Sequence, residues 1–194
     1  MKLYYSPRTR ALRPRWLLEE IAEPYTIERL DMQKGEHRSE AYKKIHPHGA
    51  VPALVDEDLH LFESSAICLY LADKFAERAL APAIGSHDRG RYYQWMVYSV
   101  ATFEPPILEF AAAKNDAKAA ETARARFDEV ARVVSAALEG KTWILGEKFS
   151  AADVMMGSLA LFASSLKLLT DHPTLSSYAD RCKQRPAFLR ARAD

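Results

Sequence analysis

The sequence predicts an α/β unit followed by an all-helical unit. Two observations support this prediction: short apolar runs alternate with helical patterns over residues 1–76, and from about residue 88 only helical periodicity remains. Between them the stretch ALAPAIGSHDRG contains Pro82 and Gly85, which interrupt regular structure. The predicted domains are therefore residues 1–76 and 88–194, joined by a linker at 77–87.

The first unit is predicted to have the order βαβαββα. KLYY indicates a strand, and the helix in RALRPRWLLEEIA should begin close to residues 9–13, because Pro14 lacks the N–H that a helix interior needs. YTIERLDM predicts a second strand and HRSEAYKKIHPHG a short polar helix. VPALVDE and LHLF, with an acidic turn between them, predict a hairpin, and SSAICLYLADKFA predicts an amphipathic helix.

The second unit shows four helical stretches, which in chain order are RYYQWMVYSVATFEPPILEFAAAKN, AAETARARFDEVARVVSAALEG, SAADVMMGSLALFASSLKLL and PTLSSYADRCKQRPAFLRA. The third opens on FSAADV, which predicts a capping box with Ser150 as N-cap and Asp153 as the third helical residue. We assign this motif to stability.

Composition excludes several classes of protein. The net charge of +1 creates no long-range field that would favour nucleic acid, and no run approaches the roughly 20 apolar residues of a membrane helix. Cys68 and Cys182 lie in apolar helical patterns without metal-type spacing, which is typical of reduced thiols. We expect a cytoplasmic protein with no metal and no nucleic-acid or membrane partner.

The chain resembles the cytosolic glutathione S-transferases, as found in bacteria, over nearly its whole length. The resemblance rests on KLYYSPRTRALRPR, on FSAADVMM and most specifically on GEHRSEAYKKIHPHGAVPALVDEDLHLFESSAICLYLADKF, where a Val-Pro pair, a hairpin and a Glu-Ser helix start follow in order. It implies a thioredoxin-like N-terminal domain, an all-helical C-terminal domain and a homodimer. It also implies a detoxification enzyme that joins glutathione, its co-substrate, to a small apolar electrophile.

The resemblance assigns most glutathione contacts to this middle block. Pro52 is expected to be cis, so that the Val51 backbone pairs with the cysteinyl part of glutathione as an added strand would. Ser64, at a helix start, is expected to bind the γ-glutamyl carboxylate, and Glu63 the γ-glutamyl ammonium. A plain N-cap with an acidic first turn is the alternative explanation.

The glycine carboxylate of glutathione needs a cation or a donor. Ala50 stands where many members of the family have a lysine, so His37 becomes the first candidate, with His48 and Arg38 as substitutes. In related proteins a group near Glu104 reaches the γ-glutamyl ammonium of the other subunit, and we expect the same here.

The resemblance places thiol activation after the first strand. Thr9 falls at the position of the serine in serine-type classes, and its alternative role is to cap the first helix. Ser6 is the second candidate and Tyr5 the third. Arg10 falls at the cysteine position of another class and could stabilise a thiolate by charge, although arginine cannot act as a base. Arg13 remains open between the thiolate, the γ-glutamyl carboxylate and the partner chain.

The helical half supplies candidates for the wall of the electrophile site, namely Tyr98, Phe103 and Phe110, with core packing as the alternative for each. Two other functions stay open: a non-catalytic relative that binds a protein partner, and another glutathione-dependent enzyme such as a peroxidase, isomerase or dehalogenase. A thioredoxin-type disulfide oxidoreductase would need a cysteine after the first strand, and SPRTR contains none.

Overall fold

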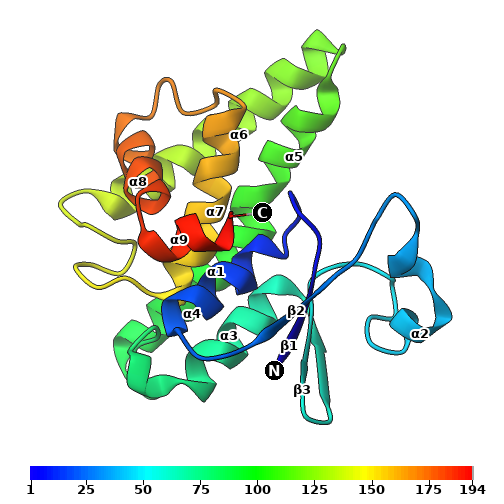
Figure 1. Ribbon diagram of the computed structural model, residues 1–194. Coiled ribbons are helices and arrows are strands. Elements are labelled where there is room, and N and C mark those ends of the chain that lie inside the picture. Colours follow the sequence, from blue (N-terminus) through cyan, green and yellow to red (C-terminus); the bar gives the residue numbers. More distant parts are fainter. Residues whose placement is uncertain (194) are drawn as a thin grey trace. The chain divides into compact units, whose positions relative to one another are not determined.

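The computed structural model describes residues 1–193, which form two compact units (Figure 1). Unit 1 contains Met1–Arg78 together with the segment that begins at Pro186, and unit 2 is Ala79–Arg185. The predicted fold class is confirmed, because unit 1 is a small mixed sheet with helices and unit 2 is helical.

Unit 1 contains the predicted elements in the predicted order, with these bounds: β1 (Lys2–Tyr5), α1 (Leu12–Ile21), β2 (Thr26–Arg29), η1 (Glu36–Arg38), α2 (Glu40–Lys43), β3 (Ala53–Asp56), β4 (Leu59–Phe62), α3 (Ser64–Lys74) and η2 (Ala76–Arg78). The strand order in the sheet is β2-β1-β3-β4, in which β1 and β2 are parallel and the other two pairs antiparallel. Helices α1 and α3 lie on one side of the sheet and α2 on the other (Figure 1).

The pleat of β1 supplies both sides of the sheet with apolar groups. Leu3 and Tyr5 are buried, and Tyr4 between them points to the opposite face. There its ring lies 5.1 Å from the ring of Tyr42, which forms a small second core with Leu30. Tyr42 therefore fastens the α2 segment to the sheet.

The C-terminal segment differs from the sequence-based division, which placed residues 88–194 in one helical domain. Helix α9 (Pro186–Ala191) packs on α1 as part of unit 1. The Phe188 ring meets the buried Trp16 edge-on at 4.8 Å, and Arg190 donates to the carboxylate and the carbonyl of Glu19, each at 2.8 Å. Pro186 separates this helix from the preceding one, because it has no N–H to continue the hydrogen-bond ladder.

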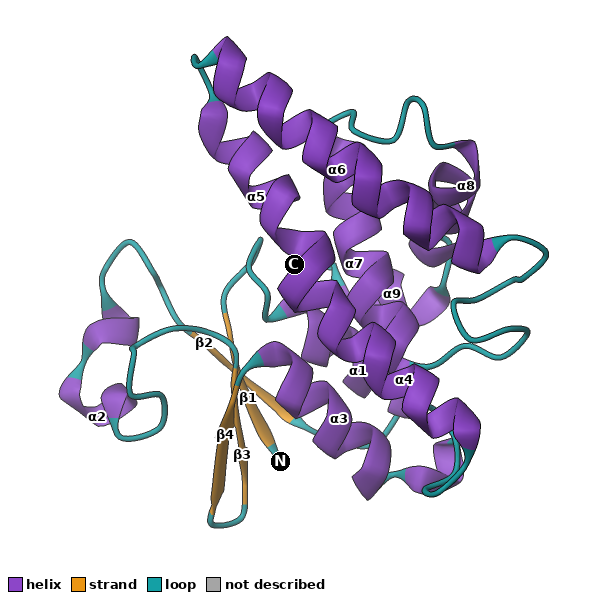
Figure 2. Ribbon diagram, turned by 180° about the vertical axis from the view of Figure 1, so that it is seen from behind, coloured by secondary structure: helices purple, strands orange, loops and turns teal. Residues whose placement is uncertain are grey.

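Unit 2 is built from α4 (His87–Tyr98), the π-helix η3 (Ser99–Phe103), α5 (Glu104–Ala113), α6 (Ala117–Leu138), α7 (Ala151–Ser165) and α8 (Pro173–Lys183). Figure 2 shows α5 and α6 running side by side. Among residues 1–193 no helix is both long and apolar enough to cross a membrane.

A π-helix interrupts the aromatic-rich stretch that the sequence presents as one long helix. Pro105 and Pro106 donate no N–H, so the normal ladder of hydrogen bonds cannot pass through them. The chain widens by one residue instead, and the Glu104 N–H donates to the Ser99 carbonyl. Glu104 consequently becomes the first residue of α5, where it is buried.

The predicted capping box is confirmed at the start of α7. The Ser150 N–H donates to the Asp153 carboxylate at 2.9 Å. The same carboxylate also accepts hydrogen bonds from the Ile144 N–H at 2.8 Å and the Tyr178 hydroxyl at 3.0 Å. Asp153 therefore joins three parts of unit 2 in addition to capping one helix.

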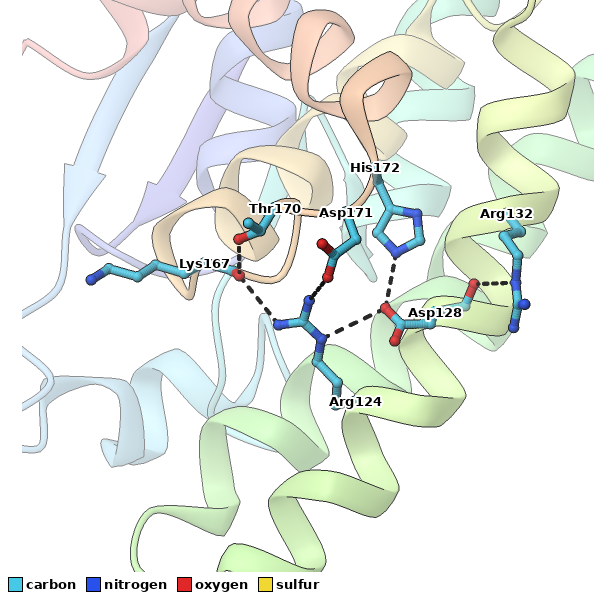
Figure 3. Close-up of polar contacts among 7 residues, drawn as sticks. All are labelled: Arg124, Asp128, Arg132, Lys167, Thr170, Asp171 and His172. Carbon is cyan, nitrogen blue, oxygen red and sulfur yellow. Dashed lines mark hydrogen bonds and ion pairs between the residues drawn. The ribbon is translucent and has the colours of Figure 1, made fainter.

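A polar cluster joins α6 to the turn before α8 (Figure 3). Arg124 donates to the Asp171 carboxylate at 2.9 Å and lies 3.7 Å from Asp128. Asp128 in turn lies 2.9 Å from the buried ring of His172, the residue that precedes α8. These contacts fix the start of α8 against α6.

Candidate functional site

Three of the segments that carry predicted site residues of unit 1 come together at one end of its sheet. Tyr4 pairs with Ala53 across β1 and β3, and Ala53 pairs with Phe62 across β3 and β4. Both pairs are antiparallel, so the end of β1, the start of β3 and the end of β4 lie at the same end of the sheet, which is where Ser6, Val51 and Ser64 stand in the chain. Three segments that are far apart in the chain are thereby placed side by side.

The central one of these three residues belongs to the Val-Pro pair. The Val51–Pro52 peptide bond is cis, as expected; Val51 is half-buried and Pro52 is buried. The Tyr42 hydroxyl donates to the Ala50 carbonyl at 2.6 Å, which holds the chain just before this bond. Tyr42 was missed by sequence reasoning, because a tyrosine in a short polar helix carries no sign of that distant contact.

At the start of α3, backbone N–H donors follow a residue with a strained backbone conformation. Glu63 is the N-cap residue, is exposed, and has φ 72° and ψ 116°, while its side chain makes no capping hydrogen bond. A non-glycine residue in such a conformation costs about 1–3 kcal/mol, and residues of this kind cluster at functional sites. Ser64 is the first helical residue and is buried. The plain N-cap explanation therefore accounts for neither side chain.

A buried arginine stands beside this helix terminus. Arg13 comes from the first turn of α1, and its guanidinium donates to the Ser64 hydroxyl at 3.2 Å. Both side chains are buried. A guanidinium and the positive end of a helix dipole at one point favour an anion, and arginine matches carboxylates especially well. The sequence left three roles open for Arg13, and the structure places its guanidinium beside Ser64 at the start of α3.

The loop between β1 and α1 holds the candidates for thiol activation. The Thr9 hydroxyl donates to the Ser6 carbonyl at 2.7 Å and accepts from the Ala11 N–H at 3.2 Å, so in this structure it fastens its own loop. Ser6 is a buried residue, and its hydroxyl forms no hydrogen bond with any of residues 1–193. Arg10 is exposed in the same loop. Tyr5 is buried with the Arg15 guanidinium 4.7 Å from its ring centre.

The candidates for the glycine carboxylate lie in the loop that leads to Val51. His37 is buried, and its Nδ1 has no hydrogen-bond partner among the described residues. His48 is exposed, and its N–H donates to Nδ1 of His46 at 3.3 Å. Burial, and next the neighbouring His48, lower the pKa of His46, a residue that sequence reasoning missed. Gly49, the neighbour of His48, lies close to the His37 backbone, because a Cβ at Gly49 would be 2.5 Å from the His37 carbonyl oxygen.

The candidate residues in unit 2 differ in how much of their surface a ligand could reach. Phe103 is completely buried and packs on Phe127, with ring centres 5.6 Å apart, so it belongs to the core of unit 2. Tyr98 and Phe110 are half-buried and keep exposed surface for a ligand. Glu104 is buried at the start of α5. Of the three predicted wall residues, two remain available.

Two family models together cover nearly the whole chain. One, described as the glutathione S-transferase N-terminal domain, matches residues 1–73, and the other, described as the glutathione S-transferase C-terminal domain, matches residues 73–186. The chain belongs to the glutathione S-transferase family.

Similar proteins agree with this assignment. The glutathione S-transferase GstA of Escherichia coli O157:H7 is 28% identical over 189 residues, which cover 96% of this chain and 94% of GstA. The disulfide-bond oxidoreductase YfcG of Escherichia coli K12 is 27% identical over 198 residues, covering 95% and 91%. A solved sphingomonad glutathione S-transferase complexed with glutathione is 29% identical, with a TM-score of 0.86 and coverage of 99% and 97%. The similarity extends over both units.

Proposed function

We propose that this chain binds glutathione at this end of the sheet in unit 1 and conjugates it to a small electrophile. The observation that carries the proposal is the buried Arg13 guanidinium, 3.2 Å from the Ser64 hydroxyl at the start of α3. A buried cation at a helix N-terminus, at the same end of the sheet as the Val51–Pro52 pair, matches an extended peptide that ends in a carboxylate.

Each part of glutathione has a partner in this proposal. The γ-glutamyl carboxylate binds Ser64 and Arg13, and the ammonium binds the Glu63 carboxylate. The cysteinyl backbone pairs with Val51 as an added strand. The glycine carboxylate binds His37, whose buried Nδ1 lacks a partner among residues 1–193, with His48 as the exposed substitute.

Thiol activation requires a modest free energy. A cysteine thiol titrates near 8.5, and lowering its pKa by about two units corresponds to about 2.7 kcal/mol. One hydrogen bond to a charged group supplies about 1.5–3 kcal/mol. We assign this bond to the Thr9 hydroxyl. When glutathione binds, this hydroxyl donates to the thiolate in place of the Ser6 carbonyl. Ser6 is the second candidate, because its hydroxyl is not engaged with any of residues 1–193. Arg10 adds positive charge.

Several finer features belong to the same proposal. Tyr98 and Phe110 contact the apolar part of the electrophile. The chain acts as a homodimer, in which Glu104 reaches the γ-glutamyl ammonium bound to the partner subunit. Detoxification in the cytoplasm is the biological setting that the family suggests, and buried Cys68 and Cys182, which form no disulfide, are compatible with a reducing compartment.

A calorimetric titration of glutathione tests the binding frame. Glu63→Gln is expected to weaken binding about fivefold, and Arg13→Met about 30-fold or more, because a buried charge partner is worth at least about 2 kcal/mol. Glu57→Gln makes the same change in the exposed β3–β4 turn and serves as control. Wild-type protein that binds no glutathione at millimolar concentration would refute the proposal and favour the non-catalytic interaction module.

Activity measurements separate the remaining alternatives. Thr9→Val should lower kcat toward a general electrophile by about tenfold while glutathione affinity is retained, and Ser6→Ala should change kcat by less than about threefold. The reverse order would transfer the thiolate role to Ser6. Panels of peroxides, isomerisable substrates and organic halides decide among the other glutathione-dependent reactions.

YfcG motivates a disulfide exchange assay as well. In this chain we expect such a reaction to use the thiol of glutathione, because Cys68 and Cys182 are both buried and burial raises the pKa of each thiol. Disulfide reductase activity that survives Cys68→Ala and requires glutathione would place this chain beside YfcG in function.

A further inference from the structure

We infer that Arg8 selects electrophiles that carry an anionic group. This inference rests on the proposed function, since it assumes that glutathione presents its thiol at the loop between β1 and α1. It adds a substrate class to a site whose other electrophile contacts are apolar and unspecific.

The backbone at Arg8 has a conformation that suits glycine. Ser6, Pro7, Arg8 and Thr9 form a turn that the 2.7 Å hydrogen bond from the Thr9 hydroxyl to the Ser6 carbonyl closes. Pro7 is the first central residue, and Arg8, the second, has φ +58°. Turns with proline first and a positive φ second normally place glycine there, because a Cβ is strained in that region.

Within the described residues, no contact stabilises an arginine at this position. Arg8 is exposed, and it forms no hydrogen bond, ion pair or ring contact with any of residues 1–193. The cost of the positive φ is therefore not offset by any contact of the Arg8 side chain with the described chain. Residues in such a conformation cluster at functional sites, and Arg8 differs from the other positive-φ residues in lying beside the proposed thiolate site, which motivates a role for its guanidinium in binding.

The charge around this turn is one-sided. The first 18 residues contain no aspartate or glutamate, and their basic residues are Lys2, Arg8, Arg10, Arg13 and Arg15. Arg13 and Arg15 are buried, whereas Arg8 and Arg10 are exposed in the loop. Arg8 lies directly before Thr9, the residue to which we assign the thiolate. The exposed guanidinium of Arg8 thus stands one residue from the proposed thiolate site, and this segment contains no carboxylate to neutralise it.

The chemistry of that cation defines the ligand. A guanidinium presents paired N–H donors that match a carboxylate or a related planar oxyanion, and it stays charged at every working pH. The class of co-substrate is thus an electrophile with a carboxylate or similar anion near its reactive carbon. In the reaction a bond forms between the glutathione sulfur and that carbon, the leaving group departs with its electron pair, and the thiol proton passes to the solvent.

Two matched aromatic electrophiles test the inference. A chloronitrobenzoate and the corresponding chloronitrobenzamide differ in charge but share the displaced chloride and the activating nitro group. The measured quantity is the ratio of kcat/KM for the benzoate to that for the benzamide, in wild type, Arg8→Gly and Arg8→Lys. Glycine suits the positive φ, so Arg8→Gly should melt no lower than wild type.

The ratio is expected to fall about fivefold in Arg8→Gly, which corresponds to about 1 kcal/mol, and to stay within about twofold of wild type in Arg8→Lys. Added salt should lower the ratio in wild type but not in Arg8→Gly. A ratio that is the same in wild type and Arg8→Gly overturns the inference and leaves the proposed function intact. If wild type neither binds glutathione nor turns over either electrophile, the inference and the proposed function are both overturned.

Discussion

At the scale of single residues, two glycines of unit 1 show how a close approach shapes the candidate site. Gly35 and Gly49 both have positive φ, at 75° and 57°. A Cβ at Gly49 would lie 2.5 Å from the His37 carbonyl oxygen, whereas at Gly35 nothing lies within 4 Å. Gly49 therefore keeps the His37 segment against the chain that leads to Val51.

Gly49→Ala should lower the free energy of unfolding by more than Gly35→Ala does. Gly35→Ala costs only the strain of a positive φ, about 1 kcal/mol. In Gly49→Ala the new Cβ must also displace the His37 backbone, which adds to that cost. The displaced His37 should weaken glutathione binding in Gly49→Ala alone. Urea unfolding and calorimetry measure the two effects, and equal losses of stability in both variants would contradict the close approach.

Asp153 links stability to pH at the same scale. Burial raises the pKa of this carboxyl to about 6, against hydrogen bonds that oppose the shift. Because the folded state binds the proton more tightly than the unfolded state, this group favours folding at low pH. Its contribution is present below about pH 4, the unfolded value, and is lost as the pH rises through about 6.

Asp153→Asn should therefore have two effects. At pH 7 it lowers the free energy of unfolding by about 1–3 kcal/mol, because an amide cannot accept all the bonds that the carboxylate accepts. Between pH 4 and 6, the window set by the pKa of about 6, wild type should become less stable as the pH rises. The variant has no carboxyl at this position and should not show this decrease. Urea unfolding across this range measures both, and an unchanged difference between the two proteins at all pH values would contradict the pKa shift.

At the scale of secondary-structure elements, α9 shows what local patterns can and cannot predict. Its helical character was predictable from the stretch PTLSSYADRCKQRPAFLRA, but its membership of unit 1 was not. That membership depends on Phe188 and Arg190 meeting Trp16 and Glu19, and the latter pair is 171 residues apart in the chain. The π-helix before α5 was likewise missed, although the proline pair that causes it was visible.

Phe188→Ala should destabilise unit 1 rather than unit 2. Removal of a buried phenylalanine costs about 3–5 kcal/mol, here through a cavity beside Trp16. The neighbouring Leu189→Ala is the matched control, because Leu189 is 56% exposed and should cost less than about 0.5 kcal/mol. Hydrogen exchange should show lost protection in α1 for Phe188→Ala only. Equal loss of protection in α7 would argue against the assignment of α9 to unit 1.

At the scale of the whole molecule, the homodimer remains a prediction with a defined test. Tyr93 and Val97 lie one turn apart on α4, and 45% and 60% of their surfaces are exposed. Exposed apolar neighbours on one helix face are typical of an interaction surface. Sedimentation should give twice the chain mass of 21.9 kDa, and Val97→Glu should shift the protein toward monomer. Sedimentation of wild type as a monomer would refute the dimer and the proposed reach of Glu104.

The sequence by itself determined the order of elements, the fold class and the position of the Val-Pro and Glu-Ser pairs. These features depend on periodicity, on proline and glycine, and on motifs contained within short segments. Only the tertiary structure decided that Arg13 reaches Ser64, that Thr9 bonds to its own loop and that Phe103 belongs to the core. Such contacts depend on the direction of side chains after packing, which no local pattern contains, because the partners Arg13 and Ser64 are 51 residues apart.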